Sequence, residues 1–207
     1  MTKTNDFDER ALTWDNDPMK VARAGCVADY IKQSISLTKG MKGLEYGCGT
    51  GLLSFNLHSD LKSIKMADNS DGMIAVLKDK VKDSGIDNMF PINLDLTADS
   101  IIDEKFDIIY TSMTLHHIIE VDVVLEKFSE MLNVGSYLCI ADLDEEDGSF
   151  HGKDFEGHKG FNRGDLEQKL ENLGLNTIHY KFCFEMKREH SGDKVYNVFV
   201  LIAKKAN

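Results

Sequence analysis

Seven short apolar runs, most of them separated by helical patterns, constrain the fold more than any other feature of the sequence. The first five runs alternate with stretches whose apolar residues recur at helical spacing, which is typical of a parallel sheet covered by helices. We expect strands at 41–46, 64–67, 90–94, 106–110, 137–141, 177–186 and 195–203. We expect helices at 18–35, 51–57, 71–82, 121–132 and 165–173, with Gly135 ending the turn before the fifth strand.

The last two runs follow each other with a Ser-Gly-Asp turn sequence between them and no room for a crossover helix. Strands with so short a connection must pair antiparallel. The predicted fold is therefore α/β: a Rossmann-like, doubly wound, mostly parallel seven-stranded sheet that closes with a C-terminal antiparallel hairpin. We expect one domain over 1–207, with a helical segment at 1–40 ahead of a core at 41–207.

Charge and composition limit the partners that a chain of this kind can have. The 207 residues include 24 basic and 35 acidic side chains, for a net charge of −11, so the chain repels phosphate backbones and we expect no nucleic-acid partner. The four scattered cysteines form neither a zinc motif nor a disulfide framework. The polar first residues, and the lack of any run of about 18 apolar residues, predict a cytoplasmic protein without membrane insertion. The oligomeric state is left open.

A glycine cluster follows the first predicted strand, in the segment LEYGCGTG at 44–51. Glycine at 47, 49 and 51 lets the backbone turn tightly and approach a ligand without an intervening Cβ. The following helix offers free N–H groups to a ligand carboxylate. The nearest alternative is the dinucleotide fingerprint G-x-G-x-x-G, but Leu52 stands where that pattern requires its third glycine.

With the acidic residue two places before the first glycine, the segment resembles motif I of the class I S-adenosylmethionine-dependent methyltransferases. The resemblance covers 44–141 by motifs and the C-terminal hairpin by topology. It implies S-adenosylmethionine as the cofactor, with Glu45, Gly47, Gly49 and Gly51 in its site. The segment TSMTLHHI resembles the small-molecule branch, which includes quinone- and sterol-type methyltransferases, and implies a small-molecule acceptor.

Further residues fall where this resemblance places cofactor contacts. Asp68 ends the second strand about 20 residues after the first glycine, where a carboxylate accepts from ribose hydroxyls. Met73 matches the apolar residue that packs on adenine. Asp95 matches the acid that accepts from the adenine amino group, with the Leu96 N–H facing the ring. Thr111 follows the fourth strand, where the family lines the methionine end of its cofactor.

Candidate catalytic residues follow from the chemistry of methyl transfer. The methyl group of a sulfonium is already electrophilic, so the protein must align an acceptor and exclude water. A hydroxyl, thiol or amine acceptor is also helped by a general base. His116 and His117 lie at the predicted carboxyl end of a strand and are the candidates, although either could be a core or helix-start residue. His151 and His158, in the long loop at 142–162, are further candidates, the alternative being that they are simply exposed. Trp14, Met113, His116 and His158 are expected to line the substrate pocket.

Two segments outside the strands and helices are expected to enclose that pocket. The long polar loop at 142–162 is predicted to lie over it. The segment at 7–30 contains the only tryptophan and is predicted to be a lid, the alternative being an anchor on the outside of the sheet. An acidic run opens the loop, at Asp142, Asp144, Glu145, Glu146 and Asp147. Because ligands for a hard cation must converge, we expect a solvated loop, and no metal.

Three functions remain open at this stage. The favoured one is metal-independent transfer of a methyl group from S-adenosylmethionine to a small molecule by in-line displacement. A regulatory protein that binds S-adenosylmethionine without catalysis is an alternative. A nicotinamide-dependent oxidoreductase is disfavoured by Leu52 and by the antiparallel finish of the predicted sheet.

Overall fold

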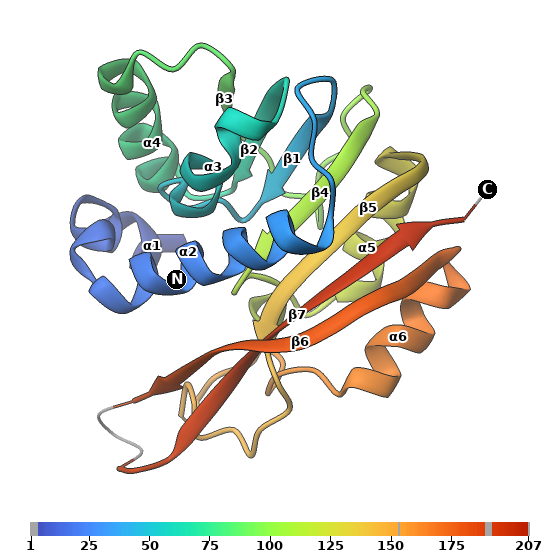
Figure 1. Cartoon of the computed structure of the whole chain (residues 1–207). Helices are drawn as coiled ribbons and strands as arrows, with labels where there is room; N and C mark the ends of the chain where they lie inside the picture. Colours follow the sequence, from blue (N-terminus) through green and yellow to red (C-terminus); the bar gives the residue numbers. More distant parts are fainter. Residues whose placement is uncertain (1–3, 153, 189–191, 207) are drawn as a thin grey trace.

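The apolar runs form one seven-stranded sheet in the order β3-β2-β1-β4-β5-β7-β6 (Figure 1). The computed structural model describes residues 4–152, 154–188 and 192–206. The strands are β1 Lys42–Tyr46, β2 Ser63–Asp68, β3 Met89–Asn93, β4 Phe106–Ser112, β5 Leu132–Leu143, β6 Leu175–Lys187 and β7 Val195–Lys205. The predicted α/β fold is confirmed.

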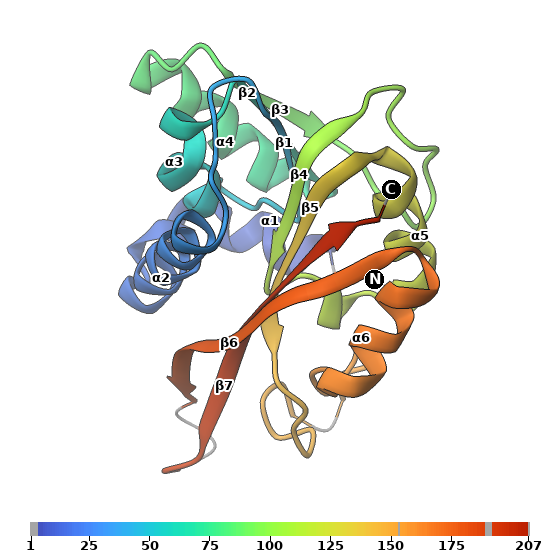
Figure 2. The ribbon, with the colours of Figure 1, turned by 45° about the vertical axis from the view of Figure 1, so that its right-hand side comes forward.

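Helices cover both faces of this sheet (Figure 2). The helices are α1 Thr4–Arg10, α2 Pro18–Ser34, α3 Leu52–Leu57, α4 Asp71–Ser84, α5 Val121–Met131 and α6 Arg163–Asn172, with short 3₁₀ turns η1 Ala11–Asn16, η2 His58–Asp60 and η3 Leu115–His117. On one face, α2, α3 and α4 share an apolar cluster with sheet residues such as Met66 and Ile108. On the other, α5 and α6 pack with Leu44, Ile109 and Leu201. The sheet is therefore doubly wound, as predicted.

The pairing of the strands defines where a ligand can bind. β1 pairs in parallel with both β2 and β4, and β4 pairs in parallel with β5. The chain leaves β1 toward β2 and β3 and then returns to β4, so the winding direction changes between β1 and β4. Open α/β sheets bind their ligands at the carboxyl ends of strands flanking such a change. β7 pairs antiparallel with β5 and β6, which confirms the predicted hairpin.

One predicted boundary is wrong. Gly135 was expected to end a turn before the fifth strand, but β5 begins at Leu132 and Gly135 lies inside it with φ +78°. Phe106 pairs with Leu132 while Ile108 pairs with Tyr137, so β5 carries extra residues at this point. A glycine with positive φ accommodates such a bulge as readily as it ends a turn, and the sequence alone does not separate the two.

The segment before the sheet is held by its own local bonds. Asp17 caps α2, because its side chain accepts from the N–H groups of Met19 at 2.9 Å and Lys20 at 3.4 Å. Val27 and Ile31 of α2 are buried against the sheet. Within the described part of the chain, no helix has both the length and the apolar character that crossing a membrane requires.

The packing of α5 predicts a large stability difference between two phenylalanines. Phe128 is fully buried, with its ring 5.4 Å from that of Tyr46, whereas Phe182 on β6 is 48% exposed. Phe128→Ala should lower the free energy of unfolding by about 3–5 kcal/mol, because it leaves a cavity in the core. Phe182→Ala is the matched control and should cost less than about 1 kcal/mol. Urea unfolding measures both, and similar values for the two variants would contradict the packing described.

Candidate active site

The glycine loop joins β1 to α3 at the change of winding direction. Gly47, Gly49 and Gly51 have φ of 69°, 52° and 81°, a region that side chains disfavour. A Cβ at Gly47 would lie 2.2 Å from Thr114 side-chain atoms, so packing alone demands glycine there. Around Gly49 a Cβ would meet only looser neighbours, the nearest being the Trp14 Nε1 at 3.7 Å. The tight packing that demands glycine at 47 is therefore absent at 49, where Trp14 and Met73 are the nearest neighbours.

Asp68 ties the end of β2 to this loop. Its carboxylate accepts from the N–H groups of Gly49 at 2.7 Å and Ser70 at 2.9 Å. Burial raises the pKa of Asp68, while the backbone N–H groups that it accepts from act in the opposite direction. Met73 follows in the first turn of α4 and is buried, with its Sδ 3.9 Å from the Cβ position of Gly49. The structure thus brings Gly49, Asp68 and Met73 together.

Asp95 lies beside this group, at the end of β3. It accepts from Thr97 through both the N–H and the hydroxyl, and from Asn69 Nδ2 at 3.2 Å. Asn69 follows Asp68 directly in the chain, so its bond to Asp95 brings Asp68 and Asp95, the two acids predicted to bind adenosine, close together. The Leu96 N–H differs from expectation: it donates to the Tyr46 hydroxyl at 3.1 Å instead of facing an open site. Leu96 itself is fully buried.

Two other predicted cofactor residues are buried within the sheet. Glu45 accepts from the N–H and the hydroxyl of Ser54, and that hydroxyl also bonds with Tyr110. Burial raises the pKa of Glu45 to about 8. Thr111 of β4 is 1% exposed, and its hydroxyl has no hydrogen-bond partner among the described residues. Glu45 therefore holds β1 against α3, and its contact with a cofactor stays a prediction.

His116 and Asp142 form a buried pair at the carboxyl ends of β4 and β5. The Nδ1 of His116 lies 2.5 Å from Asp142 Oδ1, and the two side chains are 1% and 0% exposed. The other carboxylate oxygen accepts from the His116 backbone N–H at 3.3 Å, and Leu143 N–H donates to Oδ1. Burial alone would raise the pKa of Asp142, but the charge and hydrogen bond of His116 hold it below its ordinary value.

This pairing corrects the expectation that Asp142 belongs to a solvated acidic loop. Asp142 lies within β5, and its carboxylate is enclosed. The carboxyl end of the fifth strand must lie beside that of the fourth, where His116 was placed. That adjacency was the signal available in the sequence. When His116 is neutral and Asp142 accepts its Nδ1 proton, the lone pair lies on Nε2, and that buried atom has no hydrogen-bond partner among the described residues.

Aromatic side chains from the loop after β5 surround His116. The His151 ring lies 5.1 Å from that of His116 and is stacked at 4.0 Å on Phe155, while Phe150 approaches His116 edge-on. The loop is anchored because Phe150 packs beside Leu143 in an apolar cluster near the turn end of the β6–β7 hairpin, with Met186 and Tyr196. The loop after β5 thus lies against His116, and it brings His151, one of the further candidates, beside that ring. That the loop covers a substrate pocket stays a prediction.

His158 and Met113 were expected in the substrate pocket, and both lie beside this group. The N–H of His158 donates to the His116 carbonyl at 2.7 Å, and the buried Nε2 of His158 has no partner in the described part of the chain. Met113 has φ +56°, a strained conformation for a residue with a side chain. Its N–H donates to the Ala141 carbonyl at 2.8 Å, which carries β4 pairing past the strand end.

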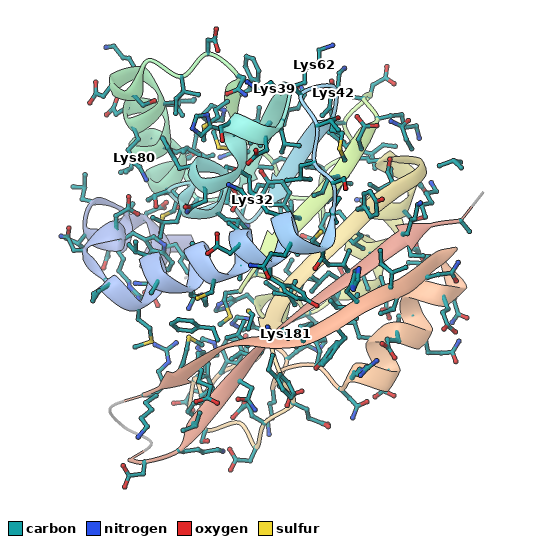
Figure 3. The ribbon with its side chains drawn as sticks, in the orientation of Figure 1. Lys32, Lys39, Lys42, Lys62, Lys80 and Lys181 are labelled. Carbon is teal, nitrogen blue, oxygen red and sulfur yellow. The ribbon has the colours of Figure 1, made fainter. Side chains whose placement is uncertain are left out.

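The segment ahead of the sheet closes over the glycine loop. Asp15 accepts from the Thr50 hydroxyl and from Lys80 Nζ, the latter at 2.6 Å. Lys80 belongs to α4 and lies on the side of that helix that faces this segment (Figure 3). Asp8 accepts from the Ser70 hydroxyl at 2.5 Å and the Gly72 N–H at 2.8 Å, at the start of α4. These bonds fix the segment to both the loop and α4.

Two aromatic rings of this segment reach the predicted site. Phe7 lies edge-on to His117, with 5.4 Å between ring centroids, and 5.8 Å from Trp14. Trp14 lies close to Gly49 and has Lys20 Nζ 3.9 Å from its ring centroid. Trp14 therefore lies over the cofactor end and Phe7 over the histidines, so the segment spans both halves of the site.

Basic side chains gather at the same end of the molecule. Arg23 of α2 donates to Met186 Sδ at 3.1 Å and forms no ion pair with any described residue. Burial, and then the neighbouring charge of Arg188, lower the pKa of Arg23 to about 10. Arg188 lies over the Phe150 ring at 4.1 Å. The charge of Asp142 acts on Arg23, so this guanidinium lies near the His116–Asp142 pair.

Comparison with known proteins agrees with this geometry. A family model described as "Methyltransferase domain" matches residues 37–200. An uncharacterised methyltransferase of Schizosaccharomyces pombe is 31% identical over 71% of this chain and 50% of its own length. A ubiquinone biosynthesis O-methyltransferase of a Chelativorans species is 32% identical over 51% of this chain and 41% of its own length. The chain thus spans about half the length of these relatives, or less.

The fold has counterparts among solved structures. An S-adenosylmethionine-dependent methyltransferase from Clostridium acetobutylicum superposes with a TM-score of 0.67, covering 96% of each chain at 17% identity. The chain therefore belongs to the methyltransferase domain family, and S-adenosylmethionine is its cofactor. Family membership removes the support for the nicotinamide-dependent oxidoreductase.

The burial of Glu45 predicts a pH-dependent stability. Since its folded pKa of about 8 lies above its ordinary 4.5, the folded protein disfavours the charged form, and stability falls as the pH rises through this window. Glu45→Gln cannot ionise. The free energy of unfolding of Glu45→Gln, minus that of the wild type, should therefore increase by about 3–5 kcal/mol from pH 5 to pH 9.

Urea unfolding of the cofactor-free protein at the two pH values measures this gain. Glu126→Gln is the matched control, because Glu126 is exposed on α5, and its stability should follow that of the wild type. A Glu45→Gln variant that tracks the wild type at both pH values would show that Glu45 is not held neutral by burial.

Proposed function

We propose that the chain catalyses methyl transfer from S-adenosylmethionine to a small-molecule acceptor, by in-line displacement at the carboxyl ends of β1 and β4. One observation carries this proposal: the segment that contains His116 is hydrogen-bonded to the glycine loop. The Thr114 hydroxyl donates to the Gly47 carbonyl at 3.3 Å, and Thr114 lies two residues before His116. A cofactor on the loop and an acceptor at the histidine would therefore be adjacent.

The residues at the loop fit the cofactor. Gly49 leaves the backbone open to close approach, and the Asp68 carboxylate retains lone pairs for ribose hydroxyls beyond the two backbone bonds that orient it. Met73 supplies an apolar surface beside them. When bound, the sulfonium supplies an electrophilic methyl group. The chain's own task is to orient the acceptor and keep water away.

The acceptor end is built from the histidines and the rings around them. Asp142 fixes the His116 ring so that the Nε2 lone pair is presented to a polar hydrogen or a cation. Phe7, Phe150 and Phe155 enclose the histidines, and apolar walls exclude water. The guanidinium of Arg23 favours an acceptor with negative charge.

The relatives support an aromatic hydroxyl as the acceptor group. Ubiquinone O-methyltransferases are among the similar proteins, and their name describes transfer to oxygen on a quinone precursor. An acidic phenol would suit both the ring-lined pocket and Arg23. The alternative is a regulatory protein that binds S-adenosylmethionine without catalysis. A panel of phenols, with and without carboxylates, separates the two, because only an enzyme releases S-adenosylhomocysteine in proportion to the acceptor consumed.

The N-terminal segment is proposed to be the lid of this site. Its bonds to Thr50, Ser70 and Gly72 are made by exposed or half-buried side chains and can break without exposing a large core. Because Trp14 already lies against Gly49, a bound cofactor must displace or repack it. Closure of such a segment would complete the exclusion of water.

The first prediction for this function concerns the ribose contact. Asp68→Ala should weaken binding of S-adenosylhomocysteine by about 1.5–3 kcal/mol, because it removes a charged acceptor. Calorimetry on the folded variant measures the loss. Asp79→Ala, an exposed change on α4, is the control and should bind as the wild type does. Unchanged affinity in Asp68→Ala would refute the placement of the cofactor.

The second prediction concerns the lid. Because Trp14 is the only tryptophan, its emission reports on this segment without interference. Saturating S-adenosylhomocysteine should shift that emission, and deletion of residues 1–17 should lower turnover more than it lowers stability. A spectrum indifferent to the cofactor, together with full activity of the truncated chain, would show that the segment is a passive anchor.

A further inference from the structure

Three imidazole rings meet at the acceptor end of the site. His116 and His117 come from η3 after β4, and His151 comes from the loop after β5. Their ring centroids lie 4.2, 5.0 and 5.1 Å apart, and one ring nitrogen from each residue lies within 4.8 Å of the other two. Three histidine nitrogens are the ligand set of one class of catalytic zinc site, where the fourth position takes water or substrate.

The surroundings of His116 are those of a metal-binding histidine. Metal-binding histidines donate their second ring N–H to a carboxylate or carbonyl, which fixes the tautomer and turns the other nitrogen toward the metal. Asp142 does this for His116, at 2.5 Å and with almost complete burial of both side chains. The remaining nitrogen, Nε2, is buried and has no hydrogen-bond partner among the described residues. An enclosed polar atom of this kind is unfavourable unless something binds it.

The distances leave only a small adjustment for coordination. Three nitrogens bound tetrahedrally at 2.0–2.1 Å lie about 3.3 Å apart, so the separations of up to 4.8 Å must close by roughly 1.5 Å. His151 is on a loop, stacked on Phe155 and not fixed in a strand, and a shift of its ring supplies the closure. Phe7 packs edge-on against His117 and Phe150 against His151, while His151 is the most exposed ring of the three, which leaves the centre open to a ligand on that side.

We propose that His116, His117 and His151 form a binding site for one divalent transition metal ion, with Asp142 as the residue that orients His116. Imidazole ligands suit zinc and its neighbours in the first transition row, not magnesium. The expectation of no metal considered the acidic run alone. The three histidines lie on two segments that only the fold brings together. Of the acidic run, Asp142 takes part in the proposed site, by orienting His116.

The metal would bind the acceptor's oxygen or sulfur, a role that rests on the proposed function. Coordination lowers the pKa of a bound hydroxyl or thiol, so its proton passes to solvent. The anion then forms its bond to the methyl carbon as the carbon–sulfur bond of the sulfonium breaks, and S-adenosylhomocysteine leaves as the neutral thioether. Charge balances, because the acceptor loses a proton and the sulfonium loses its positive charge.

Zinc and cobalt binding to the full chain test the site directly. After dialysis against a chelator, the protein should bind one equivalent of Zn²⁺ by calorimetry and one of Co²⁺ with visible absorption bands. His151→Ala and His117→Ala should each weaken Zn²⁺ binding at least ~10-fold, and Asp142→Asn by about 10–100-fold, because it disturbs the orientation of His116. His179→Ala, an exposed change on β6, is the matched control and should bind as the wild type does.

The outcomes separate this site from the proposed function. S-adenosylhomocysteine should bind His151→Ala with unchanged affinity, which also shows that the variant is folded. A wild-type chain that takes up no stoichiometric Zn²⁺ or Co²⁺, or a His151→Ala variant that binds Zn²⁺ as tightly as the wild type, would overturn the metal site. Neither result would touch methyl transfer itself, which fails only if S-adenosylmethionine does not bind or no acceptor is methylated.

Discussion

The bond between His116 and Asp142 connects every part of the molecule that meets at the site. It joins the segment after β4 to the end of β5, and Asp142 also accepts from the His116 and Leu143 backbones. Burying two polar side chains costs free energy of folding unless each forms good hydrogen bonds. His116 and Asp142 are almost fully buried and bond to each other. Because the pair is fixed, the Phe150 loop and the Phe7 segment have a rigid surface to pack on.

The fold followed from the sequence because each element carries its own local signal. Helical periodicity, strand-like apolar runs and the short join before Val195 each act within a few residues, and the observed strand pairing agrees with them. The glycine loop was also predictable, since Gly47, Gly49 and Gly51 have conformations that few other residues adopt. Gly135 was misjudged because a bulge and a turn demand the same backbone freedom.

The site was predictable where its residues follow the ends of strands in a recognised order, as Gly49 and Asp68 do. Asp142 was grouped with its acidic neighbours because sequence adjacency hides the alternation of a strand, in which successive residues face opposite sides. His151 lies 35 positions from His116, and nothing local indicates that their rings meet. Contacts that depend on how a loop folds back over a sheet edge are set by tertiary packing. They become visible only once the strands are paired.

Local irregularities gather at the edge where the function is proposed. Met113 is the one non-glycine residue with positive φ in the described part of the chain, and such strain costs of order 1–3 kcal/mol. The buried hydroxyl of Thr111 and the buried Nε2 atoms of His116 and His158 lack hydrogen-bond partners there. A core selected for stability alone would satisfy or remove such groups. Such groups around the carboxyl end of β4 are expected at a ligand-binding site, because the burial of each unbonded atom becomes favourable only when a ligand binds it.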